Sequence, residues 1–364
     1  MQINELLQLA FQYGASDVHI TVNSAPCFRI NGHLRPLNAP EIQKQFGLMS
    51  SKVDILTAAA TEQMVKDITT AEQYETFCAT GDLDFSYATS DGYRYRVNAY
   101  RQQGCAAMAI RLINSRIYSF KELGLPDVLS YLARRPRGLV LVTGPTGSGK
   151  STTLASMIDL INSEFAYHII TLEDPIEFVH QHKKSLINQR EIGRDSKSFA
   201  SALRSAMRED PDVILVGEMR DPETIAIAIT AAETGHLVFG TLHTSSAAQT
   251  IDRIIDVFPP HQQQQIRVQL ANTIQGVVAQ QLLPRIDRPG RIAAIEVMVA
   301  TPAIRNLIRE GKTYQIISQI QTGAKFGMQS LDMSLKALYQ MKAVSRDEVI
   351  NRAIDPEGLQ RMLG

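Results

Sequence analysis

The sequence predicts an α/β protein in which a smaller N-terminal α+β domain precedes a larger domain built on a mostly parallel sheet. Three observations favour this fold class. The chain has 364 residues, more than one compact domain usually contains. Its first hundred residues alternate short strand-like runs with turn dipeptides. From Arg137 onward, short β-rich apolar runs each lead into a polar cluster and a helix, as in a sheet that helices cover on both faces.

The N-terminal domain is expected over residues 1–113. Helices are predicted over 3–13, which has amphipathic spacing, and within 51–74. Strands are predicted over 17–22, 27–30, 82–87, 93–100 and 106–113. The dipeptides Asn31-Gly32 and Asp91-Gly92 are strong hairpin signals. Residues 114–126 are the expected linker.

The second domain is expected over residues 127–364 and becomes helical from about residue 300. Its predicted strands are 139–142, 168–172, 213–216 and 237–239. Helix signals between and after them are clear. Asp221-Pro222 starts a helix that Gly235 follows, Thr301-Pro302 starts one that Gly311 follows, and Ser345 with Glu348 fits a capping box.

Composition excludes several classes of protein. Lys+Arg and Asp+Glu number 37 each, so the chain is not a polyanion-coating protein and no nucleic-acid partner is expected. The three cysteines are widely spaced, which predicts neither a disulfide framework nor zinc. No apolar run approaches the roughly 18 residues of a membrane span, and the N-terminus does not resemble a signal peptide. We expect a cytoplasmic protein whose membrane association is peripheral.

A phosphate-binding loop is the strongest motif. Residues 144–151 fit G-x-x-x-x-G-K-[ST] between a strand and a helix, which is the context that this motif requires. Backbone N–H groups and the positive end of the helix would hold phosphate, Lys150 would reach the β- and γ-phosphates, and Ser151 would ligate Mg²⁺. ATP and Mg²⁺ are therefore the expected ligands. The nucleotide-binding residues are Gly144, Pro145, Thr146, Gly147, Ser148, Gly149, Lys150, Ser151 and Thr152.

Acidic residues and a histidine end the other predicted strands. Ligands of an open α/β sheet bind at the carboxyl ends of its strands, so these side chains should meet the phosphate loop. Glu218 is the leading candidate for positioning or deprotonating water, and Glu177 and Glu173 are the alternatives. Glu173 and Asp174 are further candidate Mg²⁺ ligands, partly through water. The competing interpretation is that Glu218 is a helix N-terminal charge and that the others begin a turn.

Two histidines lie seven residues apart around the last predicted strand. His243, at the strand's end, is the expected γ-phosphate sensor. His236, at its start, is expected to be structural.

Four motifs together resemble the secretion ATPase superfamily of type II/IV secretion and type IV pilus motors. GPTGSGKST is similar to its Walker A motif, ITLEDPIEF to its Asp box, VILVGEMRD to its Walker B motif and TGHLVFGTLHT to its His box. GASDVHI (14–20) and AIRNLIRE (303–310) resemble the signatures of the pilus retraction ATPases, the PilT family. The long N-terminal region and the four-cysteine module of extension and type II secretion ATPases are not found in this sequence. The stretch 43–60 looks longer than the usual family loop.

The resemblance implies a RecA-like motor domain and a PAS-like N-terminal domain. It also implies that Arg96 and Arg111 contact bound nucleotide. From the sequence alone, both of them, like Arg94 and Arg101, could equally be charged side chains that point outward from a strand. A ring-shaped homohexamer that hydrolyses Mg-ATP to retract a pilus is implied. Its expected partners are an inner-membrane platform protein, met at the cytoplasmic face of that membrane, and an accessory paralogous ATPase.

Three alternatives stay open. The first is a pilus extension or type II secretion ATPase, the second a non-hydrolysing, nucleotide-dependent regulator of the pilus machine, and the third a nucleic-acid motor. In AIRNLIRE, Ile304, Leu307 and Ile308 form an apolar face, while Arg305 and Arg309 are expected on the polar face. This helix is expected to serve coupling or partner contact and not the chemistry.

Overall fold

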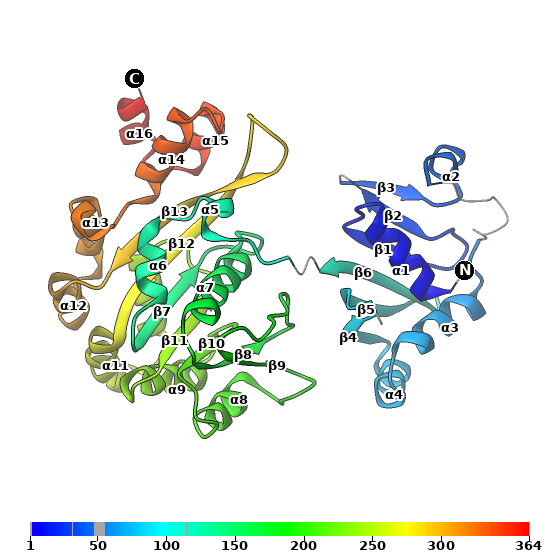
Figure 1. Cartoon of the computed structure of the whole chain (residues 1–364), viewed down its shortest axis with the longest axis horizontal. Coiled ribbons are helices and arrows are strands. Elements are labelled where there is room, and N and C mark those ends of the chain that lie inside the picture. Colours follow the sequence, from blue (N-terminus) through cyan, green and yellow to red (C-terminus); the bar gives the residue numbers. More distant parts are fainter. Residues whose placement is uncertain (1, 31, 47–54, 90, 114–115, 364) are drawn as a thin grey trace. The chain divides into compact units, whose positions relative to one another are not determined.

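The computed structural model describes residues 2–30, 32–46, 55–89, 91–113 and 116–363. The chain forms two compact units, Met1–Ser115 and Arg116–Gly364 (Figure 1). Residues 47–54, which make up much of the stretch that looks longer than in the family, lie outside the described residues, as do the first two residues of the expected linker. The rest of that linker contains a short helix, α5 (Phe120–Leu123).

The described residues of the smaller unit form a six-stranded antiparallel sheet and four helices. Its strand order is β3-β2-β1-β6-β5-β4. The strands are β1 (Asp17–Ile20), β2 (Cys27–Ile30), β3 (His33–Pro36), β4 (Asp82–Ala88), β5 (Arg94–Gln102) and β6 (Cys105–Ile113), and the helices are α1 (Ile3–Gln12), α2 (Pro40–Phe46), α3 (Ala58–Ile68) and α4 (Ala71–Thr80). Both predicted hairpins are present, although Asn31 itself lies outside the described residues. The PAS-like character of this unit stays a prediction.

The predicted helical region 51–74 contains all of α3 and the start of α4, but the helices begin at Ala58 among the described residues and continue beyond the predicted end to Thr80. α3 ends at Ile68, and Thr70 then caps α4, with its side chain accepting a hydrogen bond from the Gln73 N–H. The Gln73 side chain accepts one from Thr70 N–H in return. This reciprocal capping box starts a new helix and carries it to Thr80.

The larger unit contains a seven-stranded sheet of order β13-β12-β7-β11-β10-β8-β9. All neighbouring strands are parallel except β12 and β13, which confirms the predicted α/β class. The strands are β7 (Gly138–Thr143), β8 (His168–Glu173), β9 (Leu186–Glu191), β10 (Val213–Val216), β11 (Leu237–Leu242), β12 (Ile274–Pro284) and β13 (Arg291–Val299). The helices after α5 are α6 (Asp127–Ala133), α7 (Lys150–Glu164), α8 (Phe199–Ala206), α9 (Pro222–Glu233), α10 (Ala247–Asp256), α11 (Pro260–Thr273), α12 (Pro302–Arg309), α13 (Ile316–Gln321), α14 (Leu331–Gln340), α15 (Arg346–Arg352) and α16 (Pro356–Leu363).

Helices cover both faces of this sheet. In β7, Leu139 and Leu141 pack into one hydrophobic cluster with α9, whereas Val140 and Val142 pack into another with α6 and α7. All four side chains are fully buried, as expected for a central parallel strand. The helix starts predicted at Asp221, Thr301 and Ser345 are all confirmed, because each side chain caps its helix.

Three strands of the larger unit, β9, β12 and β13, were not among the predicted ones. β9 is an edge strand with exposed and half-buried polar residues. β12 begins directly after α11 with no Gly or Pro between them, and it buries Gln280. β13 buries Glu296 among its apolar residues. Buried polar side chains break the simple apolar pattern that identifies a strand in sequence.

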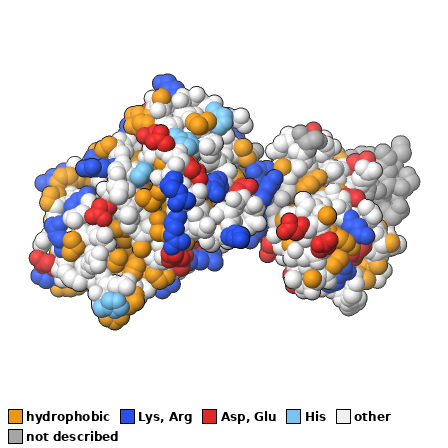
Figure 2. Space-filling view, turned by 90° about the horizontal axis from the view of Figure 1, so that it is seen from below, with side chains coloured by type: hydrophobic (Ala, Val, Ile, Leu, Met, Phe, Trp, Pro, Cys, Tyr) orange, Lys and Arg blue, Asp and Glu red, His pale blue; other side chains and the backbone are white. Residues whose placement is uncertain are grey.

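The surface shows no single dominant charge on the face seen in Figure 2. Lys and Arg side chains stand beside Asp and Glu on both units, with a short row of basic side chains on the larger one. Among the described residues, no helix is both long enough and apolar enough to cross a membrane.

Candidate active site

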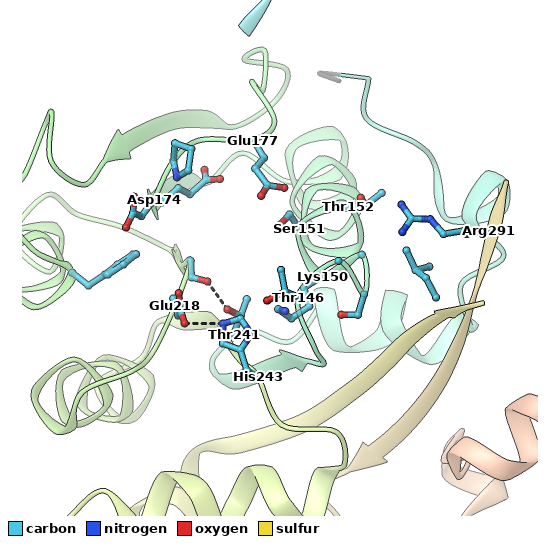
Figure 3. Close-up of a pocket in the computed structure, with 18 residues that line it drawn as sticks. Thr146, Lys150, Ser151, Thr152, Asp174, Glu177, Glu218, Thr241, His243 and Arg291 are labelled. Atoms are coloured by element: carbon cyan, nitrogen blue, oxygen red, sulfur yellow. Dashed lines mark hydrogen bonds and ion pairs between the residues drawn. The ribbon is translucent and has the colours of Figure 1, made fainter. Parts of the chain in front are cut away.

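A cavity of about 360 Å³ lies at the carboxyl ends of β7, β8, β10 and β11 (Figure 3). Because parallel strands present these ends at one edge, polar residues far apart in sequence meet there. The residues predicted for the site that line it are Thr146, Gly147, Ser148, Gly149, Lys150, Ser151, Thr152, Glu173, Asp174, Glu177, Glu218 and His243. Gly144 and Pro145 do not line it, but they form the start of the same loop.

The phosphate loop joins β7 to α7. Gly149 has φ +88°, which a residue with a side chain rarely adopts, and no side chain caps the helix that starts at Lys150. The free N–H groups of the first turn and the loop therefore form an anion-binding cradle. The Lys150 ammonium donates to the carbonyls of Gly144 at 2.8 Å and Pro145 at 3.1 Å. Burial lowers the pKa of Lys150, and the carboxylates of Glu218 and Glu177 partly oppose that shift.

Glu218 follows β10 and faces His243, which follows β11. The two side chains are joined by a hydrogen bond of 2.8 Å between His243 Nε2 and Glu218 Oε1. Arg220 Nε donates to the same carboxylate oxygen. Burial alone raises the pKa of Glu218, but the hydrogen bonds and charges of Arg220 and His243 outweigh it, so its pKa lies below the ordinary value. The carboxylate is thus held ionised, as an acceptor of a water proton must be.

The acidic cluster after β8 divides into two environments. Glu173 Oε1 accepts hydrogen bonds from Thr171 Oγ1 at 2.7 Å and Gln189 Nε2 at 3.1 Å. Burial raises the pKa of Glu173, which opposes its role as a charged ligand. In contrast, Asp174 and Glu177 present their carboxylates along the cavity without being tied to these donors (Figure 3).

The cavity suits a nucleotide triphosphate. Ser148 Oγ is buried and has no hydrogen-bond partner among the described residues, so the loop keeps a polar group available. The described residues contain no cluster of three or more His, Cys, Asp or Glu that could hold a metal by themselves. A divalent ion at this site would therefore need phosphate oxygens or water as well as Ser151 and Asp174.

Besides Pro175 and Gly217, the sequence predictions missed four residues that line the cavity: Phe199, Thr241, Leu282 and Arg291. Thr241 Oγ1 donates to the Gly217 carbonyl at 2.5 Å and so ties the end of β11 to the end of β10. Leu282 and Arg291 come from β12 and β13, and Arg291 lies beyond Thr152 in Figure 3. Thr241 could have been found as a polar residue at the end of a predicted strand. The other three carry no such signal.

The two remaining candidates, Arg96 and Arg111, belong to the smaller unit. They lie directly opposite each other on the paired strands β5 and β6. Arg111 Nε forms an ion pair of 2.9 Å with Asp17, yet 72% of the Arg111 side chain is exposed. Both guanidinium groups are thus presented together on one face of this sheet. His236, at the other end of β11 from His243, instead contacts the Ala231 carbonyl through its ring nitrogen Nδ1 at 2.9 Å.

Arg305, predicted on the polar face of its helix, contacts another helix of the larger unit, so an interpretation of it as a merely solvated charge is wrong. Its guanidinium donates to the carbonyls of Ala271 at 2.5 Å and Asn272 at 2.9 Å, at the end of α11. Arg305 is half-buried, whereas Arg309 makes a single longer contact of 3.4 Å with Asn272 Oδ1. The last carbonyls of a helix have no hydrogen-bond partner within that helix. The Arg305 guanidinium therefore serves as a hydrogen-bond donor to the end of α11.

Comparison with known proteins places the chain in one family. The family described as "Type II/IV secretion system protein" matches residues 1–289. The type IV pilus retraction ATPase PilT of Pseudomonas aeruginosa is 48% identical over 357 residues, which are 98% of this chain and 99% of that protein. A twitching motility protein of Neisseria gonorrhoeae is 48% identical over 92% of this chain and 86% of its own length.

A solved structure agrees with these sequence relationships. The crystal structure of the pilus retraction motor PilT with bound ADP superposes with a TM-score of 0.91, at 44% identity and with 100% of both chains covered. The fold, the phosphate loop and the near full-length similarity together indicate the same family. The chain belongs to the type II/IV secretion ATPase family and, within it, to the PilT-type ATPases.

Proposed function

We propose that the chain is a motor that hydrolyses Mg-ATP to retract a type IV pilus. One observation carries this: the cavity brings the phosphate-loop lysine, Lys150, and a carboxylate held ionised, Glu218, to the same edge of the sheet. A P-loop site needs a cation for the phosphates and an acceptor for water, and both groups are here. Near full-length similarity to a pilus retraction ATPase supports the cellular role.

Each side chain has a proposed part in this chemistry. Lys150 and the loop N–H groups bind the phosphates, Glu218 positions and deprotonates water, and His243 senses the γ-phosphate. Ser151 and Asp174 are the proposed Mg²⁺ ligands. Glu173 is the weaker candidate because its oxygen already accepts two hydrogen bonds from the protein. Glu177 stays the alternative base.

The working assembly is a homohexamer in which Arg96 and Arg111 reach nucleotide. Guanidinium groups suit this role because they neutralise the charge that spreads over phosphate oxygens during hydrolysis. The ring acts at the cytoplasmic face of the inner membrane, on a platform protein of the pilus, and works with an accessory paralogous ATPase. No nucleic acid is part of the mechanism.

The first test is turnover by the purified chain. Wild-type protein should hydrolyse ATP with Mg²⁺ and stop when EDTA removes the metal. The Lys150→Ala variant should neither bind nor hydrolyse ATP, because the phosphates lose their nearest cation. A folded wild-type protein that binds ATP without turnover would instead be a nucleotide-dependent regulator.

The second test separates retraction from extension or secretion. A strain that lacks this chain should carry excess pili that do not retract and should not twitch. A strain without pili would identify an extension ATPase, and a strain with normal pili and impaired protein export would identify a secretion ATPase.

A further inference from the structure

Gln280, in the middle of β12, is a buried polar side chain that none of the sequence motifs includes. It is 2% exposed and comes from a strand that pairs with β7, the strand that leads into the phosphate loop. A buried amide is stable only when both of its ends are hydrogen-bonded. The hydrogen-bond partners of the Gln280 amide therefore show which part of the structure it holds in place.

Both ends of the Gln280 amide hold the phosphate loop and the helix that follows it. Nε2 donates to the Ser148 carbonyl at 2.7 Å, and Oε1 accepts from Thr153 Oγ1 at 2.9 Å. Thr153 is itself 2% exposed and lies in the first turn of α7. One side chain thus fixes the last residues of the loop against the start of the helix.

The bond to Ser148 also sets the direction of a phosphate-facing group. In a planar trans peptide, the carbonyl of one residue and the N–H of the next point in opposite directions. With the Ser148 carbonyl held by Gln280, the Gly149 N–H points away from Gln280. Gly149 lines the cavity, so its N–H is among the donors that can hold phosphate.

The backbone of the loop fits closely around Gln280. A Cβ atom on Gly144 would lie 2.3 Å from the Gln280 carbonyl oxygen, and one on Gly149 would lie 3.1 Å from Gln280 Nε2. At these two positions of the motif, any side chain would press against Gln280, so glycine is needed where the loop contacts this residue. The contact leaves the loop little room to shift on this side.

We propose that Gln280 is a positioning residue for nucleotide binding, which orients the Ser148–Gly149 peptide so that its N–H faces the phosphates. This inference rests on the proposed ATPase function. It differs from a general packing role because it makes nucleotide affinity, and not only folding, depend on the amide.

The test compares Gln280→Leu with Gln281→Leu. Leucine keeps the approximate size of glutamine and removes both hydrogen bonds. Gln281 is the next residue of β12, and its side chain points to the opposite face, so it is the matched control. Binding of a fluorescent ADP analogue with Mg²⁺ should weaken about tenfold or more in Gln280→Leu and stay unchanged in Gln281→Leu. The KM for ATP should rise more than kcat falls, because the loss is one of ground-state binding.

Three outcomes overturn the proposal. The first is that Gln280→Leu binds ADP as tightly as wild type, and the second is that Gln281→Leu loses as much affinity as Gln280→Leu. The third is that kcat of Gln280→Leu falls while its KM is unchanged, which is the result expected when part of the sample is inactive. If Gln280→Leu does not fold, Gln280→Met decides the question, since its unbranched side chain has a shape similar to that of glutamine but cannot donate to the Ser148 carbonyl. Weaker ADP binding by this folded variant supports the proposal, and unchanged binding refutes it. Lys150→Ala separates failure of this proposal from failure of the ATPase assignment. If Lys150→Ala binds ADP normally, the ATPase assignment fails. If Lys150→Ala loses ADP binding while Gln280→Leu binds normally, only the proposal for Gln280 is refuted.

Discussion

Replacing Arg305 by alanine should destabilise the larger unit by about 2 kcal/mol. Its guanidinium bonds two carbonyls at the end of α11, and hydrogen bonds from charged donors contribute roughly 1.5–3 kcal/mol each. Two effects make the expected loss of stability smaller than the sum of the two hydrogen bonds. The side chain is half-buried, so water replaces part of what is lost. Burial lowers the pKa of Arg305, and the nearby charges of Arg135 and Arg309 lower it further, so the substitution also removes repulsion between like charges.

Thermal unfolding provides the assay. For a unit of this size, about 2 kcal/mol corresponds to a fall in melting temperature of roughly 4–8 °C. Arg309→Ala is the matched control on the same helix, and it should change the melting temperature little, because its one contact is long. Arg305→Lys should fall between them, since a single ammonium cannot reproduce the planar fork.

Two results would refute this reasoning. If Arg305→Ala melts with the wild type, the carbonyl bonds contribute nothing measurable. If Arg309→Ala is equally destabilised, the helix responds to loss of charge and not to loss of these bonds. The prediction also decides how the coupling role of AIRNLIRE should be tested: Arg309→Ala is the suitable variant, and it should keep ATPase activity while pilus retraction is lost.

Three further predictions concern the site and its support. Glu218→Gln should bind ATP and lose hydrolysis by about 10²-fold or more, as single-turnover assays would show, and normal turnover would place the base on another strand. Arg96→Ala and Arg111→Ala should fold but turn over far more slowly, and mixing either with a phosphate-loop mutant should restore some activity if subunits share sites; a mixture no more active than its parts contradicts sharing. Ile308→Ala should cost roughly 2–5 kcal/mol in denaturant titration and Leu307→Ala less, because Ile308 is fully buried and Leu307 only partly, and equal losses would show that burial does not set the cost.

The chemistry of the phosphate site was readable in the sequence because it depends on local geometry. A strand, a glycine-rich turn and a helix start are neighbours along the chain, so Lys150 and Ser151 carry their context with them. Glu218 and His243 were predicted from a rule that holds for any parallel sheet, namely that polar residues after the strands share one edge. The structure brings all four to one cavity.

What supports and completes that site was decided only by tertiary structure. Gln280 and Arg291 lie more than a hundred residues beyond the phosphate loop, on strands that the apolar pattern did not predict. The pairing of β12 with β7 places Gln280 at the site, and the pairing of β13 with β12 places Arg291 there. Arg305 shows the same limit, because the sequence gives its spacing on a helix but not the carbonyls that it meets. Hydrogen bonds between distant segments depend on which surfaces pack together, and a periodic pattern records only that a face is buried, not what covers it.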